Sequence, residues 1–368
     1  MNEWRYHNPV RLEATALESL PKLMQTLGAA TGKWLLVTSA GMTLRGVTER
    51  VKALTSTLDI DWLVHDAVTP NPELDDLDAV TARLLPDNIV GVVALGGGSV
   101  LDAAKVLAVT LPYAELNSLK ASLREGKGQQ WQTKLPLIAI PTTSGTGAEV
   151  TPFATVWDQT EHKKYSVTGT LVLPDIALLD PTLTHSLPET ETLNTGLDAI
   201  SHACESLWNV NKTPVSEAYA RLALTLAKTA LPTVLATPDD AAARAAMQQA
   251  SVLAGLAISQ TRTAIAHAIS YPLTSHFDVP HGLACSFTLS NIITEFTPQC
   301  DDYDLVVLLG RVKTMLDDLD LFGKIYKYVN REQIAALKSE MVHSERTGNS
   351  TLKLIKLENL IEEKPLLR

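Results

Sequence analysis

The 368-residue sequence has only three cysteines, and none of them belongs to a CxxC pair. An odd and sparse set of this kind, Cys204, Cys285 and Cys300, argues against a disulfide framework or a zinc knuckle. Runs of lysine or arginine are also missing, and 31 basic against 41 acidic residues leave a net charge of −10. We therefore expect neither nucleic acid nor an anionic membrane as a partner, and any anionic substrate must be bound by local features.

Long apolar runs are missing as well, which excludes a membrane-spanning helix of ordinary length. The first ten residues, MNEWRYHNPV, are polar and charged where a secretory signal needs an apolar stretch. A hydrophobic content of 45% over this length is enough for one large domain or two ordinary ones. The expectation is a cytoplasmic enzyme.

The first half of the chain alternates short apolar runs with stretches of helical periodicity. We predict strands at residues 34–39, 60–66, 89–95 and 136–140, and helices at 43–57, 73–85 and 99–110. Strands that alternate with helices are typical of a parallel sheet covered on both faces. Residues 152–180 differ, because they carry short β-like pieces with no helix between them.

From about residue 188 almost every segment has a helical pattern, as at 212–236 and 240–259. The sequence therefore predicts two domains of different class. A parallel α/β domain is expected over residues 1–186, and an all-helical domain over residues 187–368.

A glycine cluster, Gly96-Gly97-Gly98-Ser99, lies between a predicted strand and a predicted helix. Glycines let the backbone approach a ligand closely, and the N–H groups at a helix start suit a pyrophosphate. The GxGxxG fingerprint is absent, so a tight β–α turn explains the cluster equally well. A second loop, PTTSGTG at 141–147, could be a polar turn, but it also follows a strand. Two such loops at the carboxyl ends of strands favour a ligand site.

Four residues of the helical half have the side chains and the spacing of a metal site. Asp198 and His202 are four apart, which puts both on one face of a helix, and His267 and His281 follow. Each histidine taken alone fits a core or surface position at least as well. One carboxylate with three imidazoles suits Fe(II), Zn(II) or a similar divalent ion, and not Mg or Ca.

The sequence resembles the iron-containing (group III) alcohol dehydrogenase family from YHNP near its start to about residue 310. The motifs that carry the resemblance are, in order, GGGSVLDAAK, IPTTSGTGAEVT, LDPTLTHSLP, GLDAISHACES and VPHG. The resemblance implies an NAD(P)-dependent enzyme with a Rossmann-like dinucleotide domain, a helical metal-binding domain, and the cofactor and one divalent metal ion in the cleft between them. By position, the metal ligands would be Asp198, His202, His267 and His281. The cofactor would be lined by Gly97, Gly98, Ser99, Asp102, Thr142, Thr143, Ser144, Lys164 and Leu183.

Two positions depart from the pattern of that family. Many members have a histidine four residues after the third ligand, where this chain has Tyr271, which could donate a proton or merely pack. Many members end the first strand with an aspartate that binds the adenosine ribose, where this chain has Ser39. Because a serine does not repel a 2′-phosphate, we expect NADPH to be accepted alongside NADH. The family also implies a homo-oligomer such as a dimer, and the segment after residue 310 is shorter than usual.

A narrower resemblance concerns the substrate. The segment QTRTAIAHAISYPLTSHFDVPHGLACSFTL is similar to the phosphonoacetaldehyde reductase branch, which reduces phosphonoacetaldehyde to 2-hydroxyethylphosphonate. Arg262, expected on the same helix as His267, could bind the phosphonate, because its planar fork matches the phosphonate oxygens. A salt bridge to Glu149 or Glu205 explains this arginine equally well.

Three alternatives to this function remain open at this point. Another small-aldehyde or alcohol oxidoreductase of the same family would differ only in substrate. A lyase like dehydroquinate synthase would share the fold, NAD and a metal, but it would hold the metal with a glutamate and two histidines and return its cofactor unchanged. A degenerate binding protein would bind no metal.

Overall fold

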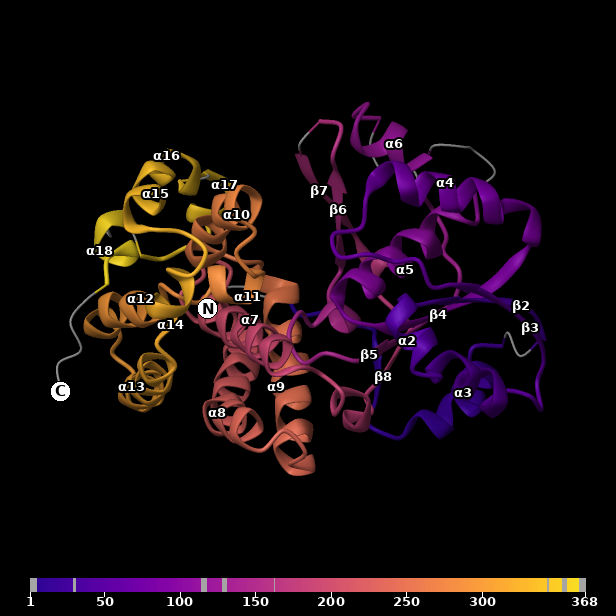
Figure 1. Cartoon of the computed structure of the whole chain (residues 1–368), viewed down its shortest axis with the longest axis horizontal. Coiled ribbons are helices and arrows are strands. Elements are labelled where there is room, and N and C mark those ends of the chain that lie inside the picture. Colours follow the sequence, from indigo (N-terminus) through magenta and orange to yellow (C-terminus); the bar gives the residue numbers. More distant parts are fainter. Residues whose placement is uncertain are drawn as a thin grey trace. The chain divides into compact units, whose positions relative to one another are not determined.

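The computed structural model describes residues 5–28, 31–113, 118–127, 131–161, 163–342, 344–352 and 356–363. By internal contacts the chain divides into two compact units, which are described separately below (Figure 1). The α/β unit comprises Asn8–Thr143 and Ala148–Thr184, and the helical unit comprises Met1–His7, Ser144–Gly147 and His185–Arg368. The short loop Ser144–Gly147 therefore groups with the helices, although it lies well before the division predicted at residue 186.

A six-stranded sheet forms the centre of the α/β unit, in the order β1-β8-β5-β4-β2-β3. All of its strands pair in parallel, which confirms the predicted Rossmann-like class. The strands are β1 (Arg11–Glu13), β2 (Thr31–Val37), β3 (Asp59–His65), β4 (Ile89–Gly96), β5 (Leu137–Pro141) and β8 (Ile176–Leu178). The sequence did not predict β1, because it has only three residues and none of them is buried.

Both faces of the sheet are apolar, since successive residues of a strand point to opposite sides. In β2, Leu35 belongs to the core that contains residues of α4 and α5, while Trp34 belongs to the core of α1 and α3. Figure 1 shows helices on both sides of the strands. The helices of this unit are α1 (Leu20–Thr26), α2 (Ala40–Leu44), α3 (Val47–Leu54), α4 (Leu74–Leu84), α5 (Gly98–Thr110) and α6 (Ser118–Leu123).

Two segments of this unit differ from the predicted elements. The helix expected at 43–57 is divided into α2 and α3, because Gly46 adopts a φ of 76° between them. The β-like region at 152–180 forms an antiparallel hairpin, β6 (Phe153–Asp158) and β7 (Lys163–Thr168), before the chain enters the main sheet at β8.

The helical unit is built on three long helices, α7 (Glu189–Leu207), α8 (Pro214–Ala236) and α9 (Ala241–Thr261), which pack against one another (Figure 1). Thr213 and Asp240 cap α8 and α9 by accepting hydrogen bonds from backbone N–H groups of the first turn. The other helices are α10 (Ile265–Phe277), α11 (His281–Ala284), α12 (Leu289–Phe296), α13 (Tyr303–Asp318), α14 (Leu321–Ile325), α15 (Arg331–Ala336), α16 (Lys338–Met341), α17 (Ser344–Thr347) and α18 (Leu357–Ile361).

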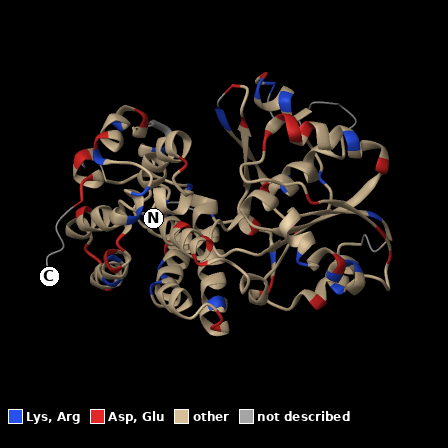
Figure 2. Cartoon of the chain, in the orientation of Figure 1, with Lys and Arg blue, Asp and Glu red and all other residues tan. Residues whose placement is uncertain are grey.

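Positions of basic and acidic residues are interspersed along the ribbon of each unit (Figure 2). Within the described ranges, no helix is long and apolar enough to cross a bilayer. The cytoplasmic location and the dimer expected from the sequence stay predictions.

Candidate functional site

The four predicted ligands lie together in the helical unit. Asp198 and His202 lie one turn apart on α7, His267 lies in the first turn of α10, and His281 begins α11. The Nε2 atoms of His202, His267 and His281 lie 3.4, 3.5 and 3.7 Å from Oδ1 of Asp198. Three histidines from three helices therefore surround one carboxylate oxygen.

These distances fit a shared cation better than they fit hydrogen bonds. They exceed the usual N–H···O length of about 3 Å. Ligand atoms that each lie about 2.1 Å from a tetrahedrally coordinated ion would be separated by about 3.4 Å. In addition, Nε2 of His267 is buried and has no hydrogen-bond partner among the described residues. A divalent ion would satisfy this nitrogen and the buried carboxylate together.

The electrostatics of the cluster also suit a cation. Burial alone would raise the pKa of Asp198, but the neighbouring imidazoles of His202, His281 and His267 hold it below its usual range. Burial lowers the pKa of His202, which favours the neutral imidazole that a metal ion requires. Burial likewise opposes the charge on His267, yet Glu205 and Asp198 raise its pKa.

Glu205 is a functional candidate that sequence reasoning did not place in the site. It is fully buried on α7, and its Oε2 lies 2.7 Å from Nδ1 of His267. Its carboxylate also accepts backbone N–H groups from Ala264 at 2.9 Å and Ala266 at 2.5 Å. The same side chain therefore caps the start of α10 and keeps a proton on Nδ1 of His267, so that Nε2 is the nitrogen left for a ligand.

The spacing of Glu205 could have revealed this role. It follows Asp198 by seven residues and His202 by three, so all three share one face of α7. Because its oxygens are used at the start of α10, Glu205 is not the salt-bridge partner of Arg262 that the sequence left open.

Cys285 is a second candidate outside the predicted set. Its buried Sγ lies 3.6 Å from Oδ1 of Asp198, and one ligand atom from each of Asp198, His267, His281 and Cys285 lies within 4.8 Å of the others. Burial raises the pKa of this thiol well above its ordinary value, and the Asp198 charge adds to the effect. A neutral thiol donates a hydrogen bond to the carboxylate, so Cys285 is better placed to orient Asp198 than to replace it.

The two residues expected to act on the substrate lie on different elements. Tyr271 is half-buried on α10, one turn after His267. Arg262 forms the C-cap of α9 and adopts a φ of 62° and a ψ of 177°. The expectation that Arg262 shares a helix with His267 is therefore wrong, because the chain turns between Thr261 and Ile265. The backbone conformation of Arg262 is one that residues other than glycine rarely adopt.

The glycine cluster and the hydroxyl-rich loop leave neighbouring strands, β4 and β5, as expected. The backbone N–H of Thr142 donates to the carbonyl of Gly96 at 3.0 Å, and a Cβ on Gly97 would lie 3.2 Å from Cγ2 of Thr143. Helix α5 begins at Gly98 with no side-chain cap. The N–H groups of its first turn are therefore suited to a phosphate, and glycine keeps the approach open.

Asp102, expected to line the cofactor, has internal partners in the α/β unit. Its Oδ2 accepts the backbone N–H of Thr155 at 2.8 Å, and its Oδ1 lies 3.8 Å from Nζ of Lys105. Burial lowers the pKa of Lys105 to about 8 and raises that of the nearby Glu149 to about 7. This buried charge cluster ties α5 to β6 and so fixes the helix that follows the glycines.

The remaining predicted cofactor residues of the α/β unit lie on different elements. Ser39 directly follows β2 as the N-cap residue of α2, and Oγ of Ser99 accepts a hydrogen bond from the backbone of Asn71 at 3.3 Å. The ammonium group of Lys164 lies 5.4 Å from the ring centre of Trp157, and Leu183 packs half-buried against the sheet.

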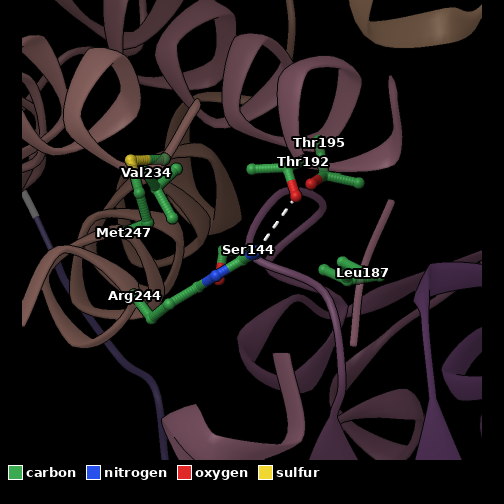
Figure 3. Close-up of a pocket in the computed structure, with 7 residues that line it drawn as sticks. All are labelled: Ser144, Leu187, Thr192, Thr195, Val234, Arg244 and Met247. Atoms are coloured by element: carbon green, nitrogen blue, oxygen red, sulfur yellow. Dashed lines mark hydrogen bonds between the residues drawn. The ribbon is translucent and has the colours of Figure 1, made fainter. Parts of the chain in front are cut away.

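Ser144 lies in the loop that groups with the helical unit. It lines a small pocket with Leu187, Thr192, Thr195, Val234, Arg244 and Met247 (Figure 3). The buried guanidinium of Arg244 extends past Ser144 and donates to Oγ1 of Thr192 at 3.0 Å. A Cβ on Gly145 would lie 2.7 Å from the carbonyl oxygen of Thr195, so the glycine lets the loop lie directly on α7.

Comparison with known proteins gives the family. The model of the iron-containing alcohol dehydrogenase matches residues 8–181, and that of the Fe-containing alcohol dehydrogenase family, C-terminal, matches residues 192–341. The long-chain-alcohol dehydrogenase 1 of Geobacillus thermodenitrificans is 33% identical over 313 residues, which cover 83% of this chain and 76% of that protein. The chain belongs to the iron-containing alcohol dehydrogenase family.

Some other relatives of this alcohol dehydrogenase are named for more specific activities. The phosphonoacetaldehyde reductase of Streptomyces viridochromogenes is 39% identical over 241 residues, or 64% of this chain and 60% of the relative. The match to the probable alcohol dehydrogenase EutG of Escherichia coli spans 55% of that protein, so both matches cover less than two thirds of the relative. The structure of a sulfoacetaldehyde reductase from Bifidobacterium kashiwanohense in complex with NAD+ superposes with a TM-score of 0.83 and 28% identity, over 98% of this chain and 97% of that one.

Proposed function

We propose that this family member is a metal-dependent, NAD(P)H-linked oxidoreductase that reduces phosphonoacetaldehyde to 2-hydroxyethylphosphonate. The observation that carries the proposal is the gathering of three Nε2 atoms within 3.4–3.7 Å of one oxygen of Asp198. The family membership supports the same reading, because its models match both units of the chain.

In this proposal Asp198, His202, His267 and His281 hold one ion, Fe(II) or Zn(II). When bound, such an ion would polarise a carbonyl oxygen as a Lewis acid, and a reduced nicotinamide would supply a hydride. Glu205 keeps the proton on Nδ1 of His267, and Cys285 donates to Asp198.

The nucleotide would bind along the loops after β4 and β5. The proposed contacts are those expected from the family: Gly97, Gly98, Ser99, Asp102, Thr142, Thr143, Ser144, Lys164 and Leu183. Ser39 has no charge to repel a 2′-phosphate, so we propose that both NADH and NADPH are used. The Ser39→Asp variant should shift the ratio of kcat/KM values toward NADH, and rejection of NADPH by the wild type would contradict this assignment.

The substrate proposal rests on Arg262 and on two relatives. Both the phosphonoacetaldehyde reductase and the sulfoacetaldehyde reductase are named for small aldehydes that carry a tetrahedral anion. Arg262 is exposed, and no carboxylate pairs with it in the part of the chain that the structure describes. An unpaired guanidinium held in a rare backbone conformation suits a substrate anion. We propose that it binds the phosphonate oxygens.

Tyr271 could also serve the reaction as a donor. Burial raises its pKa, so the side chain stays a neutral phenol that can donate a hydrogen bond. The proton of the product alcohol can come from this hydroxyl or from water.

A panel of aldehydes with NADH and NADPH tests the proposal. Wild-type holoenzyme should oxidise NAD(P)H in step with aldehyde consumed, and it should prefer phosphonoacetaldehyde to propanal. The Arg262→Ala variant should lose about 10- to 100-fold in kcat/KM on phosphonoacetaldehyde and far less on propanal, with partial rescue by Arg262→Lys.

The results of this panel also distinguish the proposed reductase from the alternatives. A lyase like dehydroquinate synthase would consume no net NAD(P)H, so failure to oxidise the cofactor with any aldehyde would contradict a reductase. Equal losses on the charged and the uncharged aldehyde would reassign Arg262 to structure and leave the substrate open.

A further inference from the structure

The side chains of Tyr271 and Arg346 form a cation–π pair near the proposed metal centre. Neither the family motifs nor the proposed ligand set includes this pair. Tyr271 lies four residues after His267 on α10, so the two side chains share one side of the helix about 6 Å apart along its axis. The guanidinium of Arg346, on α17, lies 5.8 Å from the centre of the Tyr271 ring, which is within the range of a cation–π contact.

Arg346 is a cation for which the described part of the chain offers no paired carboxylate. Among the described residues no carboxylate forms an ion pair with it, whereas Arg331, which stacks in the same way on Tyr326, also pairs with Glu363. An aromatic ring orients a guanidinium but leaves its N–H donors unused. Those donors can therefore take a tetrahedral oxyanion with bidentate geometry.

The segment that carries Arg346 is tied to the chain around the metal-binding helices. The carbonyl of Arg346 accepts the N–H of Asn349 at 3.1 Å, and Nδ2 of Asn349 donates to the carbonyl of Thr263, the neighbour of Arg262, at 3.0 Å. The N–H of Thr351 donates to the carbonyl of Trp208, which ends α7, at 2.8 Å. The segment of Arg346 is thus tied to the end of α7 and to the turn before α10, two of the three helices that bear the proposed metal ligands.

We propose that Arg346, oriented by the ring of Tyr271, binds the anionic group of the aldehyde substrate and so sets the preference of the enzyme for charged over uncharged aldehydes. The inference rests on the proposed reductase function and extends it, because a phosphonate can be shared by two guanidinium groups, those of Arg262 and Arg346. The match to the C-terminal family model ends at residue 341, and Arg346 lies beyond the matched residues.

The test compares Arg346→Met with the matched control Arg331→Met in the holoenzyme. The first change should lower kcat/KM on phosphonoacetaldehyde by about 10- to 100-fold, mostly through KM, while propanal reduction stays within about twofold. The control removes an equivalent arginine–tyrosine stack elsewhere in the same unit and should leave both substrates unaffected.

Two further variants separate the ring from the hydroxyl of Tyr271. Tyr271→Phe keeps the aromatic ring that orients Arg346. It should therefore preserve the ratio of kcat/KM on phosphonoacetaldehyde to kcat/KM on propanal, whereas Tyr271→Ala should reduce this ratio about as much as Arg346→Met. Loss of the ratio in Tyr271→Phe with no change in Arg346→Met would overturn the proposal, because the hydroxyl would then be the selective group.

Calorimetric binding of 2-hydroxyethylphosphonate to the holoenzyme distinguishes this inference from the proposed function. If the wild type reduces no aldehyde, the reductase proposal fails, and weaker binding of the anion by Arg346→Met than by Arg331→Met still supports the role of Arg346. If the wild type is a reductase but Arg346→Met loses equally on both aldehydes, or binds the anion unchanged, Arg346 is structural and the inference fails while the reductase stands.

Discussion

Glu205 and His267 show how single residues prepare the proposed metal centre. Both are buried, and burial of a carboxylate is costly unless hydrogen bonds and a counter-charge compensate for the lost water. Burial would raise the pKa of Glu205, but the His267 imidazole and the backbone N–H groups of α10 lower it below its usual value. Glu205 is therefore ionised, and it directs the free nitrogen of His267 toward Asp198.

Neutralising Glu205 should weaken metal binding without removing a ligand. Glu205→Gln keeps the shape but loses the charge that holds the proton on Nδ1, so we expect affinity for Zn(II) or Co(II) to fall about 10- to 100-fold in competition with a chelator. Glu340→Gln is the matched control, because Glu340 contacts His276 at 2.8 Å on the exposed end of the same helix. Equal affinities for the two variants would show that Glu205 does not act on the metal.

Some residues of the proposed site have a signal in the sequence, and others have none for a physical reason. Asp198 and His202 are one helical turn apart, and a spacing of four residues on a predicted helix can be recognised in the sequence. Cys285 joins them only because α11 returns to α7, and Arg346 reaches Tyr271 from a segment that matches the family weakly. Contacts between distant segments leave no periodic signal.

At the scale of elements, the position of His281 depends on a close approach between α11 and α7. A Cβ on Gly282 would lie 1.7 Å from the backbone oxygen of Asn194, far inside the van der Waals distance of two non-bonded atoms. The glycine therefore lets α11 lie directly against α7, and the residue before it, His281, comes within 3.7 Å of Asp198.

A methyl group at this contact should separate the two helices. We expect Gly282→Ala to lower the free energy of unfolding by about 1–3 kcal/mol and to weaken metal binding, because the displaced α11 carries a ligand. Gly310→Ala on α13 is the control, since its added Cβ would meet no atom within 4 Å and should be neutral or stabilising. Chemical denaturation and chelator titration measure the two effects, and wild-type metal affinity in Gly282→Ala would refute the packing argument.

Elements with a local signal were predicted well, and elements set by long-range packing were not. Helices α8 and α9 begin after the caps Thr213 and Asp240, and both lie within two residues of the ranges expected from periodicity. The turn that separates Arg262 from the helix of His267 was not expected, because Arg262 takes a φ of 62° that no sequence rule assigns to arginine.

At the scale of the whole molecule, the order of element classes was enough to predict an α/β unit followed by a helical unit. Alternating strands and helices specify a parallel sheet with a core on each face, and the structure confirms both cores. The grouping of Ser144–Gly147 with the helices was not predictable. It depends on Gly147, whose added Cβ would lie 2.5 Å from Gly255, and such contacts appear only in the folded chain.

The central claim is that one divalent ion, held by Asp198 and three histidines, is required for aldehyde-dependent oxidation of NAD(P)H. The most direct measurement is the metal content of purified wild type and His267→Ala, with turnover recorded before chelation, after chelation and after addition of Fe(II) or Zn(II). We predict about one ion per wild-type chain, loss of turnover on chelation with recovery on metal addition, and neither metal nor turnover in His267→Ala. Undiminished NAD(P)H oxidation by the chelated wild type, or full activity in His267→Ala, would contradict the account.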